Sequence, residues 1–152
     1  KSVLRKRFMV SMPDVVDRVT ILPSLSSPQW FGLLRHGDVI LDSYPFGGYT
    51  TTLEALAVGI TPIVTLPHEQ MAGRCTKGLL DILGIDDTIA ANRSDYIDIA
   101  VRLATDRAFR AGVEAQVESG AHTIWERNGT VPEWEAFLEQ VANGQAVSNL
   151  HS

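Results

Sequence analysis

Hydrophobic residues in this chain fall into short continuous runs that are separated by longer segments with helical spacing. Runs of aliphatic and β-branched residues at 18–22, 39–41 and 62–66 are predicted to be strands, the first of them buried. A shorter run at 88–90 is a candidate fourth strand. The run at 62–66 is hydrophobic throughout, as parallel strands covered on both faces are. The pattern therefore predicts a parallel sheet.

Apolar positions three and four residues apart predict helices between these runs. The first helix is expected after Ser27-Pro28, where serine supplies an N-cap and proline the first helical position, and Gly37 closes it. Further helices are predicted at 50–58 and 70–83, from a cap at Asn92 or Ser94 through Leu103, from Asp106 to Val117, and near 132–142.

The helix predicted at 50–58 is the one that matters most for function. Leu53, Leu56 and Ala57 form its expected apolar face, and Gly59 is expected in the left-handed conformation that ends many helices. With a strand on either side it completes a strand–helix–strand unit. Because strands alternate with helices, the chain is predicted to have an α/β fold.

Composition narrows the class of protein. The chain has 152 residues, about one domain, with 45% hydrophobic and 20% charged residues, as in ordinary globular proteins. Its net charge of -5 argues against a nucleic-acid-binding surface, and no apolar run is long enough for a membrane span. The single cysteine, Cys75, forms no internal disulfide and suits a reducing compartment, so a cytoplasmic location is expected. No metal-ligand spacing surrounds it.

Candidate chemistry lies at the carboxyl ends of the predicted strands, where open parallel sheets bind ligands. The loops expected at that edge are 23–27, 43–49 and 67–70, and the middle one is the most informative. Gly47-Gly48 lets the backbone come close to a ligand because no Cβ stands in the way. A Gly-Gly pair is also often only a turn.

The start of the next helix has features of a phosphate and ribose site. Tyr49, Thr50 and Thr51 open that helix, where free backbone N–H groups and the helix dipole favour an anion and hydroxyls add donors. Glu54 follows within about a turn and can accept hydrogen bonds from ribose hydroxyls. Taken singly, each feature is more often structural than functional, because threonine runs often only cap helices and the helix dipole alone favours a glutamate there. Their order along one loop and helix favours a nucleotide site.

Several consecutive segments resemble one family. The run at 44–59, YPFGGYTTTLEALAVG, with PIVT at 62–65, is similar to the nucleotide-sugar-binding signature of GT-B glycosyltransferases. Within that fold it most resembles the O-linked N-acetylglucosamine transferase and SPINDLY-like family, and the similarity continues through 66–74 and 92–106. The resemblance implies a Rossmann-like parallel sheet flanked by helices, the C-terminal half of a GT-B fold without its first strands.

The resemblance assigns roles to individual residues. It implies that Tyr49, Thr50 and Thr51 face the diphosphate and that Glu54 takes the ribose hydroxyls. It also implies that the backbone at Leu25 reads the uracil edge.

For two further residues, Trp30 and Arg74, two interpretations remain open. Trp30 falls where the family stacks a side chain on uracil, although a core position on its helix explains it equally well. Arg74 matches a family arginine, and either a phosphate contact or a salt bridge between helices fits it.

The family also implies an activity. The chain is expected to be the UDP-sugar-binding portion of an inverting glycosyltransferase, with UDP-GlcNAc or UDP-glucose as donor, no metal, and a protein or similar acceptor. The acceptor-binding GT-B domain is expected upstream, and no residue here is expected to be catalytic. The predicted organisation is a lead-in at 1–17, a nucleotide-sugar-binding domain at 18–120 and a helical tail at 121–152.

Departures from the family pattern leave alternatives open. The basic residues that the family has near Ser27 and Leu33 are absent, and His68 stands where glycine is usual. A catalytically inactive nucleotide-binding or scaffold module is therefore the second hypothesis. A different GT-B enzyme, such as a sugar-nucleotide epimerase, is the third.

Overall fold

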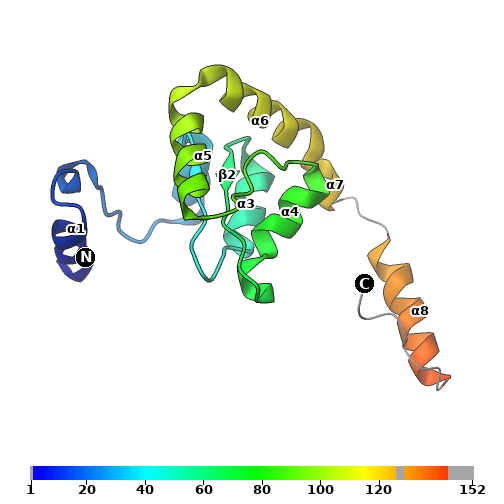
Figure 1. Ribbon diagram of the computed structural model, residues 1–152. Helices are drawn as coiled ribbons and strands as arrows, with labels where there is room; N and C mark the ends of the chain where they lie inside the picture. The colour runs from blue at the N-terminus through cyan, green and yellow to red at the C-terminus, as the bar shows by residue number, and fades with distance from the viewer. Residues whose placement is uncertain (1, 126–128, 144–152) are drawn as a thin grey trace. The chain divides into compact units, whose positions relative to one another are not determined.

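The computed structural model describes residues 2–125 and 129–143 (Figure 1). The chain divides into two compact units, Lys1–Leu33 and Leu34–Ser152. Among the described helices, none combines the length and the apolar character that crossing a membrane requires.

The first unit contains a helix, α1 (Ser2–Ser11), followed by a 3₁₀ turn, η1 (Val16–Arg18). An ion pair joins Arg5 of α1 to Asp17 of η1 at 3.3 Å, with both side chains largely exposed. Such an exposed pair contributes little to stability.

The strand predicted at 18–22 is not formed. Val19 has extended backbone angles, but no described residue forms a strand pair with this run, and Leu22 is 46% exposed. A strand depends on a hydrogen-bonded neighbour as well as on an apolar sequence. The strand predicted from the hydrophobic pattern at this run was therefore wrong.

The helix predicted after residue 27 is confirmed as α2 (Ser27–His36), but its cap lies one residue earlier. The backbone N–H and the hydroxyl of Ser26 both donate to Gln29 Oε1, each at 3.0 Å. A glutamine three residues after the cap that accepts from the cap's own N–H is half of a capping box. Ser27 is therefore the first helical residue rather than the N-cap.

The second unit is built around a small parallel sheet. β1 (Ile40–Leu41) and β2 (Ile63–Val64) pair in parallel, with Ile40 opposite Ile63. Both residues of β2 are buried, as a strand covered on two faces requires. The second and third predicted strands are thus confirmed in shortened form, and the fold is α/β.

The fourth predicted strand is present as a single parallel bridge. Thr65 pairs with Ile89, the Thr65 N–H donates to the Thr88 carbonyl at 3.1 Å, and the Ala90 N–H donates to the Thr65 carbonyl at 2.8 Å. These bonds extend the sheet by one strand position beyond β2.

The connection from β1 to β2 runs through α3 (Thr50–Val58), at the predicted bounds. Its buried residues are Thr52, Ala55 and Leu56, whereas Ala57 is exposed. The predicted apolar face was therefore rotated, because the buried stripe begins at a threonine. Gly59 is extended (φ -157°) rather than left-handed, so that prediction was wrong as well.

The single helix predicted at 70–83 is interrupted. A 3₁₀ turn, η2 (Met71–Gly73), precedes α4 (Cys75–Leu83). The carbonyls of Ala72 and Gly73 accept hydrogen bonds from loop residues instead of from the next turn of a helix. Gly84 ends α4 in the left-handed conformation (φ 68°), where glycine is the natural residue.

Two capped helices follow the fourth strand position, as predicted. The Asn92 side chain accepts the first-turn N–H groups of α5 (Arg93–Thr105), and Asp106 does the same for α6 (Arg107–Gly120). α6 packs against both α4 and α5, and α7 (His122–Trp125) packs against α4 and α6 (Figure 1).

The last described helix, α8 (Thr130–Ala142), confirms the helix predicted near 132–142. None of its residues is buried. The predicted fraying after Gly144 lies outside the described residues.

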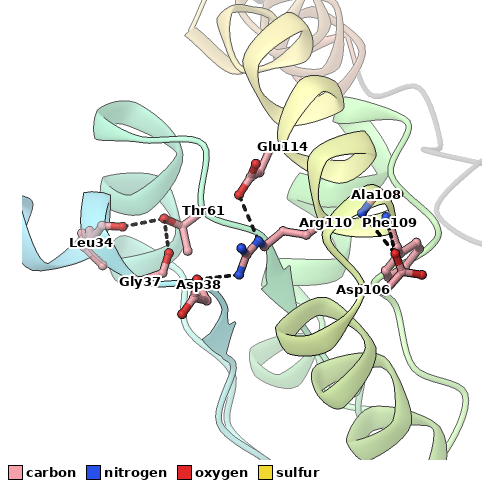
Figure 2. A network of polar contacts seen from close by, with 9 residues as sticks. All are labelled: Leu34, Gly37, Asp38, Thr61, Asp106, Ala108, Phe109, Arg110 and Glu114. Atoms are coloured by element: carbon pink, nitrogen blue, oxygen red, sulfur yellow. Dashed lines mark hydrogen bonds and ion pairs between the residues drawn. The ribbon is translucent and has the colours of Figure 1, made fainter.

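Polar contacts hold the N-terminal ends of the strands, away from the predicted site (Figure 2). The Arg110 guanidinium on α6 pairs with Asp38, just before β1, and with Glu114 at 3.7 Å. The Thr61 hydroxyl donates to the carbonyls of Leu34 at 2.7 Å and Gly37 at 3.3 Å. These contacts join α6 to β1 and the end of α2 to the segment before β2.

Candidate functional site

The candidate site begins where β1 ends, at Asp42. One carboxylate oxygen, Oδ1, accepts the N–H groups of Ser43 at 3.0 Å and Gly48 at 2.6 Å. The other, Oδ2, accepts the hydroxyl of Thr65 at 2.8 Å. The carboxylate therefore links both ends of the loop 42–49 to the strand position after β2.

The structure gives Gly47 and Gly48 a specific reason to be glycine. A Cβ on Gly47 would lie 2.9 Å from Asp42 Oδ2, and a Cβ on Gly48 would lie 2.6 Å from Thr51 Oγ1. Neither distance leaves room for a side chain. The close approach predicted for these glycines is thus realised by the protein's own side chains, which explains both residues without a ligand.

A second set of contacts ties the loop to the helices behind it. The Thr76 hydroxyl on α4 donates to the Gly48 carbonyl at 2.8 Å and lies 3.0 Å from the Thr52 hydroxyl of α3. Both threonines are buried. The Gly47 N–H donates to the Ala72 carbonyl at 3.1 Å. Thr52 is therefore a packing residue.

The first turn of α3 is left open to a ligand. Tyr49 occupies the N-cap position, and no side chain of the described residues caps the helix. Thr50 and Thr51 are exposed. The first N–H groups of a helix have no partner within it, and they attract anions together with the helix dipole. The geometry thus provides an uncapped helix start flanked by two accessible hydroxyls.

An open cavity of about 840 Å³ lies over this region. The structure brings five of the predicted site residues together in its wall, together with exposed apolar side chains of Phe46 and Met71. Its lining residues are Ser43, Phe46, Gly47, Gly48, Tyr49, Thr50, Thr51, Met71, Ala72 and Cys75. A cavity of this size is typical of small-molecule sites.

The other predicted site residues lie apart from this lining. Glu54 is half-buried in the second turn of α3. Arg74 is exposed at the start of α4, and no ion pair to it occurs among residues 2–125 and 129–143, so the salt-bridge interpretation gains no support. Leu25 and Trp30 are half-buried residues of the first unit. The roles of all four stay predictions.

The loop after β2 is held close to the loop after β1. The His68 N–H donates to the Gly73 carbonyl at 3.0 Å, and His68 Nδ1 accepts the Gln70 N–H at 3.2 Å. A Cβ on Gly73 would lie 2.4 Å from both His68 Cβ and the Pro45 carbonyl oxygen. Gly73 is thus the point at which the two loops meet.

A second cavity, of about 370 Å³, is lined by Asp42, Tyr44, Leu66, Arg93, Tyr96 and Ile97. The Tyr96 hydroxyl donates to the Asp42 carbonyl at 2.8 Å. Burial of the phenol and, secondarily, the negative charge of Asp42 raise the pKa of Tyr96 above 10.0. The Arg93 guanidinium lies 5.6 Å from the centre of the Tyr44 ring, within range of a cation–π contact.

Sequence reasoning missed the residues that hold the loop in place: Asp42, Thr65, Thr76 and Tyr96. One signal was available for Asp42, an acidic residue directly after a predicted strand at the ligand edge. Apart from the adjacent Ser43, the side-chain partners of Asp42 and the partner of its carbonyl lie 6 to 54 residues away in sequence, and no local pattern indicates such contacts.

Comparison with solved structures places this fold. A mutant O-GlcNAc transferase of Thermobaculum terrenum matches 82% of the chain with a TM-score of 0.73 and 29% identity, and the chain covers 24% of that enzyme. The architecture is therefore that of the C-terminal part of a GT-B glycosyltransferase.

The family follows from the sequence comparison. Residues 32–125, more than half of the chain, match the model of glycosyl transferase family 41, and the chain belongs to this family. A Caenorhabditis elegans UDP-N-acetylglucosamine–peptide N-acetylglucosaminyltransferase is 41% identical over 80 residues, which are 53% of this chain and 7% of that protein. The SPINDLY protein of Solanum lycopersicum is 31% identical over 110 residues, 68% of this chain and 11% of that protein. The chain thus spans a small part of these relatives.

Proposed function

We propose that this chain supplies the UDP-sugar-binding half of an inverting glycosyltransferase that transfers a sugar to a protein acceptor. The observation that carries the proposal is the uncapped start of α3 in the wall of the larger cavity. Membership of family 41, and relatives named for transfer from UDP-N-acetylglucosamine to peptides, support the same activity.

In the proposed mechanism the chain stabilises the leaving group. The bond between the sugar C1 and the diphosphate oxygen breaks, and the electron pair stays on the diphosphate. First-turn N–H groups of α3 and the hydroxyls of Thr50 and Thr51 offset the charge that develops there. The acceptor hydroxyl bonds to C1 from the opposite face, and its proton passes to a base that we do not assign to this chain.

The remaining predicted residues complete the donor site in this proposal. Glu54 accepts the ribose hydroxyls, the Leu25 backbone contacts uracil, Trp30 stacks on it, and Arg74 contacts phosphate. The sugar is N-acetylglucosamine or glucose, the acceptor-binding GT-B domain completes the active site, and the enzyme acts in the cytoplasm without a metal.

Calorimetric titration of the full chain with UDP, uridine and pyrophosphate tests the donor site. We expect UDP to bind more tightly than either fragment, because it engages the phosphate and ribose contacts together. Glu54→Ala should weaken UDP more than pyrophosphate. Equal losses for both ligands would remove Glu54 from the ribose role, and absence of UDP binding would overturn the donor-site proposal.

A second candidate function is a nucleotide-binding module without turnover. The absence of the family's basic residues near Ser27 and Leu33 favours it. UDP binding without transfer of a radiolabelled sugar to protein by the full-length protein would support this candidate. Measured transfer would exclude it.

A further inference from the structure

Asp42 has no role in the function proposed above, although its side chain and its main chain both make hydrogen bonds. Its carboxylate accepts two backbone N–H groups and one hydroxyl, from Ser43, Gly48 and Thr65. Its own backbone is fixed to the sheet and to α5, because its N–H donates to Val64 at 2.9 Å and its carbonyl accepts from Tyr96 at 2.8 Å. The main chain of Asp42 is thus held by the sheet and by α5, and its side chain holds the loop that follows.

A carboxylate at this place has an electrostatic disadvantage. It lies next to the loop proposed to receive a diphosphate, and like charges repel each other. It also accepts the N–H of Gly48, so this group is not available to a phosphate. An acidic residue is therefore expected here only if the contacts it makes within the protein offset that repulsion.

The contact with Gly48 has the features of a strong hydrogen bond. The distance from Gly48 N to Asp42 Oδ1 is 2.6 Å, and hydrogen bonds to a charged acceptor are shorter and stronger than neutral ones. From the other side, the Gly48 carbonyl accepts from Thr76 of α4. Gly48 is therefore held through both of its backbone polar groups, one residue before Tyr49 at the N-cap of α3.

We propose that Asp42 is the positioning residue of the loop 42–49. Its carboxylate fixes Gly48 and thereby holds the first turn of α3 in the position that binds the diphosphate of the donor. This inference rests on the proposed function for the identity of the ligand. The anchoring of Gly48 by Asp42 does not depend on a ligand and is measured separately.

The first measurement follows the Gly48 amide by NMR in the full chain. In the unaltered chain we expect a strongly downfield, slowly exchanging amide proton. Asp42→Ala should move it upfield and speed its exchange at least tenfold, whereas Asp42→Asn, which keeps an oxygen acceptor, should retain most of the protection. An unchanged Gly48 amide in Asp42→Ala would overturn the proposal.

The second measurement is UDP affinity. Asp42→Ala should weaken UDP about tenfold or more, and Asp42→Asn should restore most of that loss. Equal affinity of Asp42→Ala and the unaltered chain would overturn the role in positioning. If the unaltered chain does not bind UDP at all, the proposed function fails, while the Gly48 amide still decides whether Asp42 anchors the loop.

Threonines on neighbouring strand positions provide a matched control. Thr65→Val removes the hydroxyl that donates to Asp42 Oδ2, whereas Thr88→Val removes a buried hydroxyl that has no partner among the described residues. Only the first change should disturb the Gly48 amide. An equal disturbance by both would assign the effect to strand packing and would overturn the proposal.

An NMR titration of Tyr96 separates the charge of Asp42 from its capacity to accept hydrogen bonds. The negative charge of Asp42 contributes to the raised pKa of Tyr96. Asp42→Asn should therefore lower the Tyr96 pKa, measured from its phenol ring carbon signal, without releasing Gly48. A Tyr96 titration that stays the same in Asp42→Asn would count against a charged carboxylate at this position.

Discussion

Five threonine hydroxyls of the second unit lie in three different environments. Those of Thr52 and Thr76 are buried and lie within hydrogen-bond distance of each other, those of Thr50 and Thr51 border an open cavity, and that of Thr88 is buried without a partner among the described residues. Removal of a hydroxyl should therefore have a different effect in each of these environments.

Thr50 offers the most direct test of phosphate binding at the residue scale. Thr50→Val removes an exposed hydroxyl and should weaken UDP about tenfold while leaving uridine unaffected, because a hydrogen bond to a charged group is lost. Titration calorimetry measures both. The control is Thr105→Val, which removes a hydroxyl that donates to Val101 on α5. Unchanged UDP affinity in Thr50→Val would contradict the phosphate assignment.

Thr88 should tolerate loss of its hydroxyl. A buried polar group without a partner costs free energy, so Thr88→Val, of nearly the same shape, should raise the free energy of unfolding by up to about 1 kcal/mol. Thr61→Val, which removes donation to Leu34 and Gly37, should lower it by about 1 kcal/mol. Urea unfolding compares the two. A clear loss of stability in Thr88→Val would indicate a partner for its hydroxyl.

At the scale of elements, caps and carbonyl partners decide where the helices begin and end. The starts of α5 and α6 agree with the sequence because Asn92 and Asp106 accept first-turn N–H groups locally. The break between η2 and α4 could not be predicted, because the carbonyls of Ala72 and Gly73 are used by residues of other loops.

The cap of α6 should make stability depend on pH. The Phe109 N–H, with further help from Ala108 and Arg102, lowers the pKa of Asp106 below its usual 3.8. Since the folded pKa is lowered, the stabilisation is present above the usual value and is lost as pH falls through the lowered pKa. Asp106→Asn keeps an oxygen acceptor and should remove this part of the acid dependence. Urea unfolding between about pH 2 and 6 checks it, and identical profiles would refute the link.

The ion pair between Arg110 and Asp38 joins segments that are far apart in sequence, so its loss should destabilise the fold more than the loss of an ion pair within one helix. Arg110→Met removes the pair with Asp38, 72 residues away, and should lower the free energy of unfolding by about 0.5–1 kcal/mol, since Asp38 is mostly exposed. Lys77→Met removes a pair within α4 and should cost about 0.3 kcal/mol. Thermal unfolding compares them. Equal losses would mean that Arg110 adds nothing across the sheet edge.

At the scale of the whole molecule, the charge of the chain bears on ligand binding. The net charge is -5, and neither lysine nor arginine lines the larger cavity among the described residues. The proposed Arg74 contact supplies a single positive charge to the diphosphate, so UDP affinity should fall only slightly with added NaCl. Calorimetry in rising NaCl measures this slope, and Arg74→Met should abolish it. A slope that stays the same in Arg74→Met would remove Arg74 from the phosphate contact.

The fold class and the loop that lines the larger cavity could be predicted from the sequence because their signals are local. Buried strands, helix caps and the glycine pair before Thr50 each act over a few residues, and their order defines the strand–helix–strand unit. The strand at 18–22 and the role of Asp42 could not be predicted, because each depends on partners that are distant in sequence. The family resemblance supplied the identity of the ligand, which the residues alone left open.

Gly73 has a consequence for how the site can change shape. No space exists for even a methyl group at Gly73 between Pro45 and His68, where the loops after β1 and β2 come together. A substitution at Gly73 would therefore have to displace one of these loops, and it would alter the site without replacing any residue proposed to touch the ligand.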